Sequence, residues 1–346
     1  MVPFDEDKAA AYYYDREIMV RVPDDMPPGI YDLTVTVAGN ARAGVCRSPR
    51  SVYVVNRYPI DPVFISFGHL DTSGQHQAEY LERLVDVINV IGPDMVLCSN
   101  ACNAGYVSGA LASLDIPYVI NFGNHQFPGH EAWYGDPVGL VDYGPNISVL
   151  NFGLPWHCDQ SKAKSLLNSR PKTPIRVVNA FEPNAPIPFL DRQQIRLIHD
   201  AHGTGKKVAD FGATPTRRIG KTNSESFRIV RFLENSVASC TYNGHETAPV
   251  PYPRESPPPI TLSFKHANDG THDSNAVTVT NRLADAITNG RVCFILPSGE
   301  YQIDRGRHES LVTSDDGQYI ILTIRLNIPA NGVEVIRVEP HQSAEE

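Results

Sequence analysis

The chain has 346 residues, of which 41% are apolar and 20% charged, and its formal net charge is -9 at pH 7. Such a composition is typical of a globular protein long enough for two or three domains. Lys and Arg are scattered and form no basic stripe that could neutralise a phosphate backbone, which excludes nucleic acid as an expected partner. No stretch approaches the roughly 20 apolar residues of a membrane-spanning helix, so no membrane span is expected.

Three segments near the N-terminus have the composition of short β-strands. They are EIMVRVP at 17–23, PPGIYDLTVTV at 27–37 and SVYVVN at 51–56. The second alternates with a period of two, and Gly29 after two prolines supplies a turn before it. We expect a small β module of immunoglobulin or fibronectin type over residues 1–58.

From residue 62 onward, apolar strands alternate with amphipathic helices. Strands are predicted at VFISF, DMVLCSN, IPYVINFGN, NISVLNFG, IRVVNAF and KKVADFG, and helices at AEYLERLVDVINVIG, VSGALASLD and RQQIRLIHDAHG. A two-strand ending, FRIVRFLENSVASCTYNG, closes this part. Alternating β and α units predict an α/β core over residues 59–246 with parallel strands, whose functional groups gather at the carboxyl ends of those strands.

The remaining sequence divides into a stiff linker and a second β-rich part. Residues 247–260 contain the Pro-rich run PVPYPRESPPPI, which predicts a linker. Residues 261–340 alternate as half-buried strands separated by Gly and Asn turns, and they predict a C-terminal β-sandwich.

The six cysteines are spread along the chain without a CxxC pair. This spacing excludes a zinc ribbon and a CxxC redox motif, and free buried thiols are expected.

An ordered series of blocks in the core is similar to the calcineurin-like metallophosphoesterases. The blocks are ISFGHL, MVLCSNAC, IPYVINFGNHQ, WYGDPVGLVDYGPNISVLNFG, IRVVNAFEP and KKVADFGATPTRR. In that family the corresponding signature is Asp-x-His, Gly-Asp, Gly-Asn-His-Asp/Glu, a lone His and Gly-His-x-His, each after a core strand. The resemblance implies a four-layer α/β/β/α sandwich core, flanked here by N-terminal and C-terminal β-sandwich modules.

Most of the metal ligands implied by this resemblance are replaced. The first Asp falls on Phe67, the bridging Asp on Asn100 after Ser99, the lone His on Ala180, and the two last His on Ala213 and Pro215. Gly-Asn-His is intact as Gly123, Asn124 and His125, but Gln126 follows it, and His69 keeps the first imidazole. Only His69 and Asn124 survive among the metal ligands, and both are neutral.

A neutral ligand set cannot hold the pair of metal ions that the resemblance implies. Two dications about 4 Å apart repel by roughly 15 kcal/mol even at an effective dielectric constant of 20. No cofactor is therefore expected, or at most one weakly bound divalent metal. The first hypothesis is a catalytically inactive relative with a vestigial His125, which serves as a binding or scaffold module.

Two interpretations of the retained residues stay open. His69, Asn100, Asn124 and His125 form a pocket for phosphate or another anion, or they are hydrogen-bonded loop residues that the fold requires. The partner would be a protein or a small phosphorylated ligand, neither of which the sequence identifies. The resemblance also implies an extracytoplasmic location.

Two further hypotheses compete with the inactive binding module. In one, the chain is a metal-dependent phosphoesterase with a rearranged site. Its candidate ligands are Asp71, His76, His130, Glu131, Glu182 and Asp210. In the other, the chain is a structural or envelope-associated protein whose domains are building blocks. His199 and His202, at a spacing that places both on one face of the predicted helix, are interpreted as residues near its C-terminus.

Overall fold

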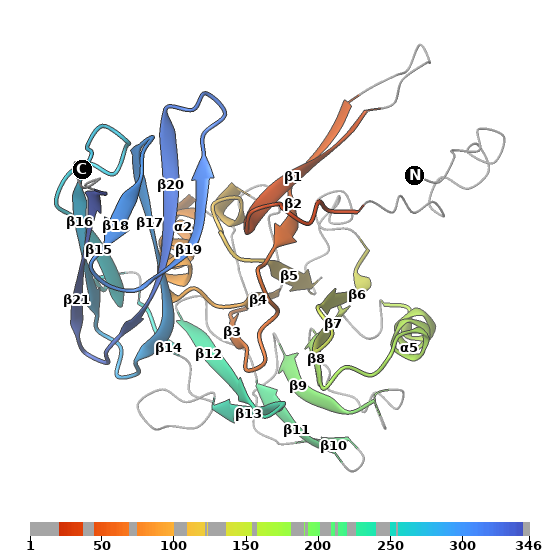
Figure 1. The fold of residues 1–346 in the computed structure, drawn as a ribbon. Coiled ribbons are helices and arrows are strands. Elements are labelled where there is room, and N and C mark those ends of the chain that lie inside the picture. Colours follow the sequence, from red (N-terminus) through yellow and green to blue (C-terminus); the bar gives the residue numbers. More distant parts are fainter. Residues whose placement is uncertain are drawn as a thin grey trace.

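The computed structural model describes residues 21–36, 45–68, 75–99, 109–121, 123, 136–153, 158–180, 190, 193–200, 209–211, 214–219, 226–239, 250–253 and 255–341. Within these residues strands predominate, and they form several separate sheets beside two longer helices (Figure 1).

Two sheets form the centre of the molecule. The first has the strand order β13-β12-β3-β4-β5, and the second β10-β11-β9-β8-β7-β6. The first comprises β3 (Val63–Ser66), β4 (Met95–Ser99), β5 (Tyr118–Asn121), β12 (Ser226–Leu233) and β13 (Ser236–Ser239), with β14 (Val250–Pro251) paired to β12. The second comprises β6 (Val138–Tyr143), β7 (Ile147–Phe152), β8 (Ile175–Ala180), β9 (Ile195–Asp200), β10 (Ala209–Phe211) and β11 (Thr214–Ile219).

The central strands are continuous apolar runs because they are buried on both faces. All six residues of β7 and all six of β8 are buried, as are five of the six residues of β9. Strands β3, β4 and β5 are parallel, and so are β7, β8, β9 and β11. Parallel strands covered on both faces have this composition, whereas half-exposed strands alternate.

The two central sheets pack against each other through one apolar cluster. Phe64, Leu97 and Val119 of the first sheet contact Val149 and Val177 of the second within this cluster. Each sheet therefore buries one face between the two, and the outer faces are left for other elements.

Helix α5 (Gln160–Ser169) covers the outer face of the second sheet. Its buried Ala163 and Leu167 belong to the same apolar cluster as Leu150 and Val178. The Asp159 side chain accepts a hydrogen bond from the Lys162 backbone N at 3.0 Å and thereby caps the first turn. At the other end, the buried side chain of Arg176 donates to the carbonyl oxygens of Leu167 at 3.4 Å and Pro171 at 3.1 Å.

Helix α2 (Gln75–Ile91) covers the outer face of the first sheet. Its buried Leu84 and Ile88 share an apolar cluster with Ile65 and Val96 of the sheet. Gly92 ends the helix with φ +62°, and its backbone N donates to the Ile88 carbonyl at 3.0 Å. Glycine adopts this left-handed conformation at little cost, which is why it commonly stops a helix.

The N-terminal described residues form a β-hairpin. Strands β1 (Gly29–Thr36) and β2 (Val45–Val54) pair antiparallel, and the outer part of the ribbon projects from the body (Figure 1). Tyr53 packs against the cluster between the central sheets, and the Arg50 side chain donates to the Leu114 carbonyl. The inner end of the hairpin is thus attached to the core.

The C-terminal residues form two further sheets that share a core. The strands are β15 (Ile260–Phe264), β16 (Asn275–Asn281), β17 (Ile287–Pro297), β18 (Tyr301–Ile303), β19 (Arg307–Thr313), β20 (Tyr319–Ile328) and β21 (Val333–Pro340). Their sheet orders are β15-β16-β21-β18 and β17-β20-β19. The alternating strands predicted over residues 261–340 are confirmed.

The C-terminal sheets are docked on helix α2. Val292, Phe294 and Ile324 lie in the same apolar cluster as the buried face of α2. The Arg325 side chain donates to the Gly92 carbonyl at 2.8 Å and forms an ion pair with Glu309 at 2.7 Å. A buried arginine on the carbonyl directly after a helix fixes that end of the helix against the sheet.

The predicted fold class, a four-layer α/β/β/α sandwich core flanked by β-sandwich modules, is wrong. The described chain is mostly strand, with few helices and several small sheets, and α2 lies between two β-rich parts rather than in an outer layer. At the N-terminus the described residues give a two-stranded hairpin, and residues 21–23 of the predicted first strand are not strand. Composition and periodicity alone do not show which elements come to cover a helix.

The helix predicted at RQQIRLIHDAHG is also wrong, because Ile195–Asp200 is strand β9. This strand pairs with β8 on one side and β11 on the other, and its burial outweighs the helical spacing of its apolar residues. His199 therefore lies in a sheet, and His202 lies outside the described residues.

Three cysteines with described side chains, Cys98, Cys158 and Cys293, are free thiols, and Cys98 is buried. No helix in the described ranges is long and apolar enough to cross a membrane.

Candidate functional site

Buried polar side chains collect at the carboxyl ends of the parallel strands of both central sheets. They are Ser66 of β3, Asn121 of β5, Asn151 of β7, Asn179 of β8, and His199 and Asp200 of β9, and none is more than 7% exposed. Each is the last or the second-to-last residue of its strand. Because parallel strands of one sheet end at the same edge, the chain brings polar groups from distant segments together there.

Asn179 is the centre of this cluster. Its Nδ2 donates to the carbonyl oxygens of Cys98 at 3.0 Å and Val119 at 3.2 Å, and to Asn151 Oδ1 at 3.1 Å. Asn151 in turn donates to the Ile120 carbonyl at 2.7 Å. These bonds join the two facing sheets by polar contacts at a position where the rest of the interface is apolar.

The protonation state of His199 follows from its contact with Asn179. The Nδ1 of His199 lies 2.7 Å from Asn179 Oδ1, an oxygen that also accepts from Asn121 Nδ2 at 3.3 Å. Since the three contacts of Asn179 Nδ2 fix its oxygen as an acceptor, Nδ1 of His199 carries the proton. Complete burial, with a smaller effect from Arg228, lowers the pKa of His199 to about 3. The imidazole is therefore neutral at physiological pH.

Three buried atoms of the cluster have no hydrogen-bond partner among the described residues. They are Ser66 Oγ, Asn121 Oδ1 and His199 Nε2. The first can donate or accept a hydrogen bond, and the other two are acceptors. Such a set suits an ordered water or a neutral donor. A histidine with a pKa of about 3 does not transfer protons near neutral pH.

Two positions to which the phosphoesterase resemblance assigns metal ligands are described with their side chains, and both are apolar core. Phe67 is 1% exposed and packs in the cluster with α2, while Ala180 is 0% exposed and packs in the cluster with α5. The two side chains thus face opposite sides of the paired sheets. Ser99 ends β4 and Pro215 lies in β11, where only the backbone is described.

The other predicted site residues lie outside the described part of the chain. They are His69, Asn100, Asn124, His125, Gln126 and Ala213, and the alternative metal ligands Asp71, His130, Glu131 and Glu182 lie outside it as well. His76 lies in α2 and Asp210 in β10, without described side chains. Their proposed roles stay predictions. Among the side chains that are described, no three or more of His, Cys, Asp and Glu are grouped so that they could hold a metal ion.

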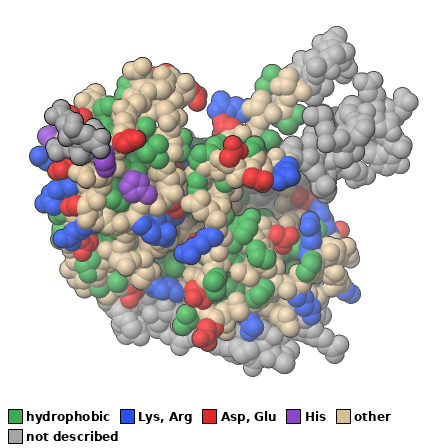
Figure 2. All heavy atoms as spheres, in the orientation of Figure 1, with side chains coloured by type: hydrophobic (Ala, Val, Ile, Leu, Met, Phe, Trp, Pro, Cys, Tyr) green, Lys and Arg blue, Asp and Glu red, His purple; other side chains and the backbone are tan. Residues whose placement is uncertain are grey.

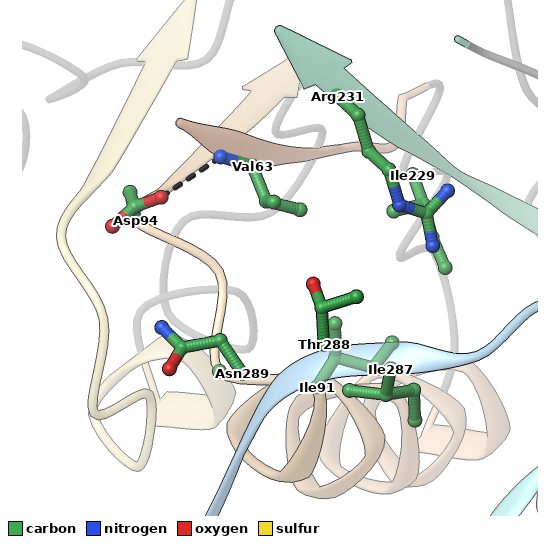
Figure 3. A pocket seen from close by; sticks show the side chains of 9 residues that line it. Val63, Ile91, Asp94, Ile229, Arg231, Ile287, Thr288 and Asn289 are labelled. Carbon is green, nitrogen blue, oxygen red and sulfur yellow. Dashed lines mark hydrogen bonds between the residues drawn. The ribbon is translucent and has the colours of Figure 1, made fainter. Parts of the chain in front are cut away.

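A small pocket lies at the opposite, amino ends of β3 and β4, where the core meets the C-terminal sheets (Figure 3). Asp94 lies on one side of it and Arg231 on the other, with Thr288 and Asn289 of β17 between them. Its cavity volume of about 20 Å³ has room for roughly one water molecule. It is therefore no ligand site.

Asp94, a charged residue that lines this pocket, has a raised pKa. Its Oδ2 accepts from the Val63 backbone N at 2.8 Å, and its own backbone N donates to the Val63 carbonyl at 2.8 Å. Burial raises the pKa of Asp94 to about 6, although the bond from Val63 and the charge of Arg325 both lower it. Arg231 across the pocket donates to the Ala286 carbonyl at 3.2 Å.

Sequence reasoning did not assign Asn179 or Asp94 to a site, and it placed His199 in a helix. Asn179 and His199 each lie one residue before the end of their observed strand. A polar residue near the end of an apolar segment was the signal that the sequence offered. Asp94 is a single acidic residue directly before strand β4, and nothing in its sequence neighbourhood distinguishes it from an ordinary turn residue.

Comparison with known proteins adds little to this description. No family model matches the chain, and no curated protein matches it. Among solved structures it is similar to one described as "GAP50 the anchor in the inner membrane complex of Plasmodium". The match has a TM-score of 0.35 and 9% sequence identity, and it covers 56% of this chain and 88% of the other. A likeness at this level supports no conclusion about fold or function.

Proposed function

We propose that the chain is a binding or scaffold protein that does not hydrolyse phosphoesters. The observation that carries this proposal is the burial of Phe67 and Ala180. The resemblance assigns a metal-binding Asp and His to these positions, and the side chains there are 1% and 0% exposed in two separate apolar clusters. Neither position offers a group that could bind a cation, and neither faces a common cavity.

The polar groups at the strand ends support the same proposal. Asn179, Asn151 and His199 are hydrogen-bonded to one another and to strand carbonyls. A catalytic acid or base needs a pKa near the working pH and contact with substrate, whereas His199 is fully buried with a pKa of about 3. These residues stabilise the contact between the sheets rather than act on a substrate.

The mixed charge of the surface favours a role in binding proteins over a role in binding polyanions. Figure 2 shows Lys and Arg side chains interspersed with Asp and Glu over the visible face, without a broad field of one sign. Mixed surfaces of this kind do not concentrate phosphate-rich ligands by steering.

Metal analysis of the purified chain, combined with an aryl phosphate assay, tests the proposal. We expect no stoichiometric metal, and no turnover after dialysis against manganese or zinc. The matched variant is His125→Ala, which should behave as the parent does. Turnover by the parent that chelation and His125→Ala both abolish would contradict the proposal and favour a metal-dependent phosphoesterase with a rearranged site.

A further inference from the structure

A groove separates helix α2 from the edges of the two C-terminal sheets. Its cavity volume is about 460 Å³, which lies in the range of ligand pockets, unlike the small pocket beside Asp94. Val87 and Val90 of α2 form one wall, and Leu262 and Phe264 of β15 form another. The helix contacts both β15 and β17, and the strands lie beside it in Figure 1.

Strand β15 presents an unpaired edge to this groove. In the described part of the chain, it pairs with β16 only. The Lys265 backbone N donates to the Ala276 carbonyl at 2.8 Å, so odd-numbered residues of β15 make the bonds to β16. Because bonding direction alternates along an antiparallel strand, the backbone groups of Ile260, Leu262 and Phe264 point the other way. The same three residues line the groove.

The facing edge of β17 is closed in a different way. The Asn268 side chain donates to the Cys293 carbonyl at 3.0 Å and accepts from the Ile295 backbone N at 2.9 Å. One asparagine thus replaces a neighbouring strand at β17, while β15 has no equivalent among the described residues. Unpaired edges pair with further strands unless something covers them, so β15 is the edge that remains available.

The charge at the groove favours a basic partner. Arg291 is engaged by Asp115 at 2.8 Å and by Glu309 at 3.2 Å, and Arg83 lies over the Tyr252 ring and donates to the Ser256 carbonyl. By contrast, Asp86 is exposed on the α2 wall. Partial burial and the nearby Glu82 raise the pKa of Asp86, and within the described part of the chain its carboxylate forms no ion pair.

We propose that the groove binds an extended peptide segment of a protein partner, which adds as a strand to the free edge of β15 and places a basic side chain beside Asp86. Backbone hydrogen bonds supply affinity in this mode, and side-chain pockets beside the edge supply selectivity. The inference rests on the proposed binding role but concerns a different surface. Detection of phosphatase turnover would contradict that role. It would not test peptide binding in the groove, which has a separate experiment.

Fluorescence anisotropy with a labelled peptide, Lys-Thr-Val-Thr-Val-Thr-Lys, tests the proposal on the full chain. We expect saturable binding that weakens with added salt, since one contact is ionic. The same peptide with alternate amides N-methylated on the pairing edge should bind at least ~10-fold more weakly, because it loses backbone donors while keeping its side chains. This control requires no change in the protein.

Two variants locate the binding at β15. Leu262→Pro removes one donor from the free edge and leaves the bonds of Ser263 to β16 in place, so it should weaken binding at least ~10-fold. Leu262→Val is the matched control and should bind within about twofold of the parent. Asp86→Asn should weaken binding a few-fold and reduce its salt dependence.

Four results would overturn the proposal. Three are absence of saturable binding, equal affinity for the N-methylated and parent peptides, and binding by Leu262→Pro equal to that by Leu262→Val. The fourth is self-association of the chain in sedimentation that Leu262→Pro abolishes, since a second copy of the chain would then be the occupant of the edge.

Discussion

The two ends of the central parallel strands are built differently. At the carboxyl ends, Asn151, Asn179 and His199 are buried and bonded to one another, the carboxyl group of Asp200 is buried at the end of β9, and His199 has a pKa of about 3. At the amino ends, the charged Asp94 and Arg231 flank a small pocket at the contact with the C-terminal sheets, and the pKa of Asp94 is raised to about 6. The end where α/β proteins usually place their chemistry is here a packed interior, whereas the opposite end holds a carboxyl group whose pKa is raised to about 6.

The largest expected effect is that of Phe67→Asp, which places a carboxylate at a position where the phosphoesterase resemblance implies one. Phe67 is 1% exposed in an apolar cluster, so the change buries an unpaired charge and should lower the free energy of unfolding by about 4 kcal/mol or more. Phe67→Leu is the control, with a loss of about 1 kcal/mol. Urea denaturation measures both. A small loss for the Asp variant would mean that the position is open to solvent.

Asn179→Ala should come next, with a fall of about 3 kcal/mol in the free energy of unfolding. The change removes five hydrogen bonds and leaves Asn151 Oδ1 and His199 Nδ1 without their partner in the core. Asn168→Ala is the matched control, because that side chain only accepts from Gln193 at an exposed position, and it should cost less than about 0.5 kcal/mol. Equal losses for the two variants would contradict the network.

Gly92→Ala tests the amino-end contact with the C-terminal sheets. A Cβ at Gly92 would lie 2.3 Å from Arg325 Nη1 and 2.9 Å from the Asn289 carbonyl oxygen, in a backbone conformation with φ +62°. We expect a loss of about 2 kcal/mol in the free energy of unfolding, from backbone strain and the displaced arginine. Gly109→Ala, where a Cβ would meet nothing within 4 Å, should change it by less than about 1 kcal/mol. A neutral Gly92→Ala would show that this contact is loose.

A smaller effect is expected from pH at Asp94. The pKa of Asp94 is raised from 3.8 to about 6 in the folded state, so the folded chain binds more protons between these values. The stabilisation by protonated Asp94 is complete below 3.8 and is lost as the pH rises through about 6. Asp94→Asn should therefore be more stable than the parent at pH 8, by at most about 2 to 3 kcal/mol, and the difference should vanish toward pH 4.

Thermal unfolding of the parent and Asp94→Asn between pH 4 and pH 8 measures this difference. Subtracting the two curves removes the opposite slope from His199, whose depressed pKa costs stability as the pH falls below 6.5. A difference that stays constant over the whole range would show that Asp94 does not titrate there.

The sequence predicted individual elements better than their assembly. The apolar strands from VFISF to IRVVNAF and the amphipathic helix α2 are where the periodicity indicated them. The error at Ile195–Asp200 arose because β9 is inserted between β8 and β11, and pairing on both sides overrides a helical spacing. The error in fold class arose because α2 is covered by the C-terminal strands, a contact between segments about 200 residues apart that no local pattern records.

The candidate site was predictable only in its location. Functional groups were expected at the carboxyl ends of the parallel strands, and the buried polar cluster lies there, but Asn121, Asn179 and His199 were not among the residues predicted for it. Their roles depend on partners from four different strands, so no single segment reveals them. The raised pKa of Asp94 likewise results from burial under the C-terminal sheets rather than from neighbouring residues.

The titration of His199 tests the central claim, that the carboxyl ends form a closed interior, most directly. Imidazole chemical shifts followed by NMR, with assignment by His199→Gln, give its pKa in the folded chain. The structure predicts neutral shifts, protonated at Nδ1 alone, with no change from pH 8 down to about pH 4. A midpoint between about pH 6 and pH 7, near the value of a free histidine, would mean that the imidazole meets solvent and that an open site exists at these strand ends.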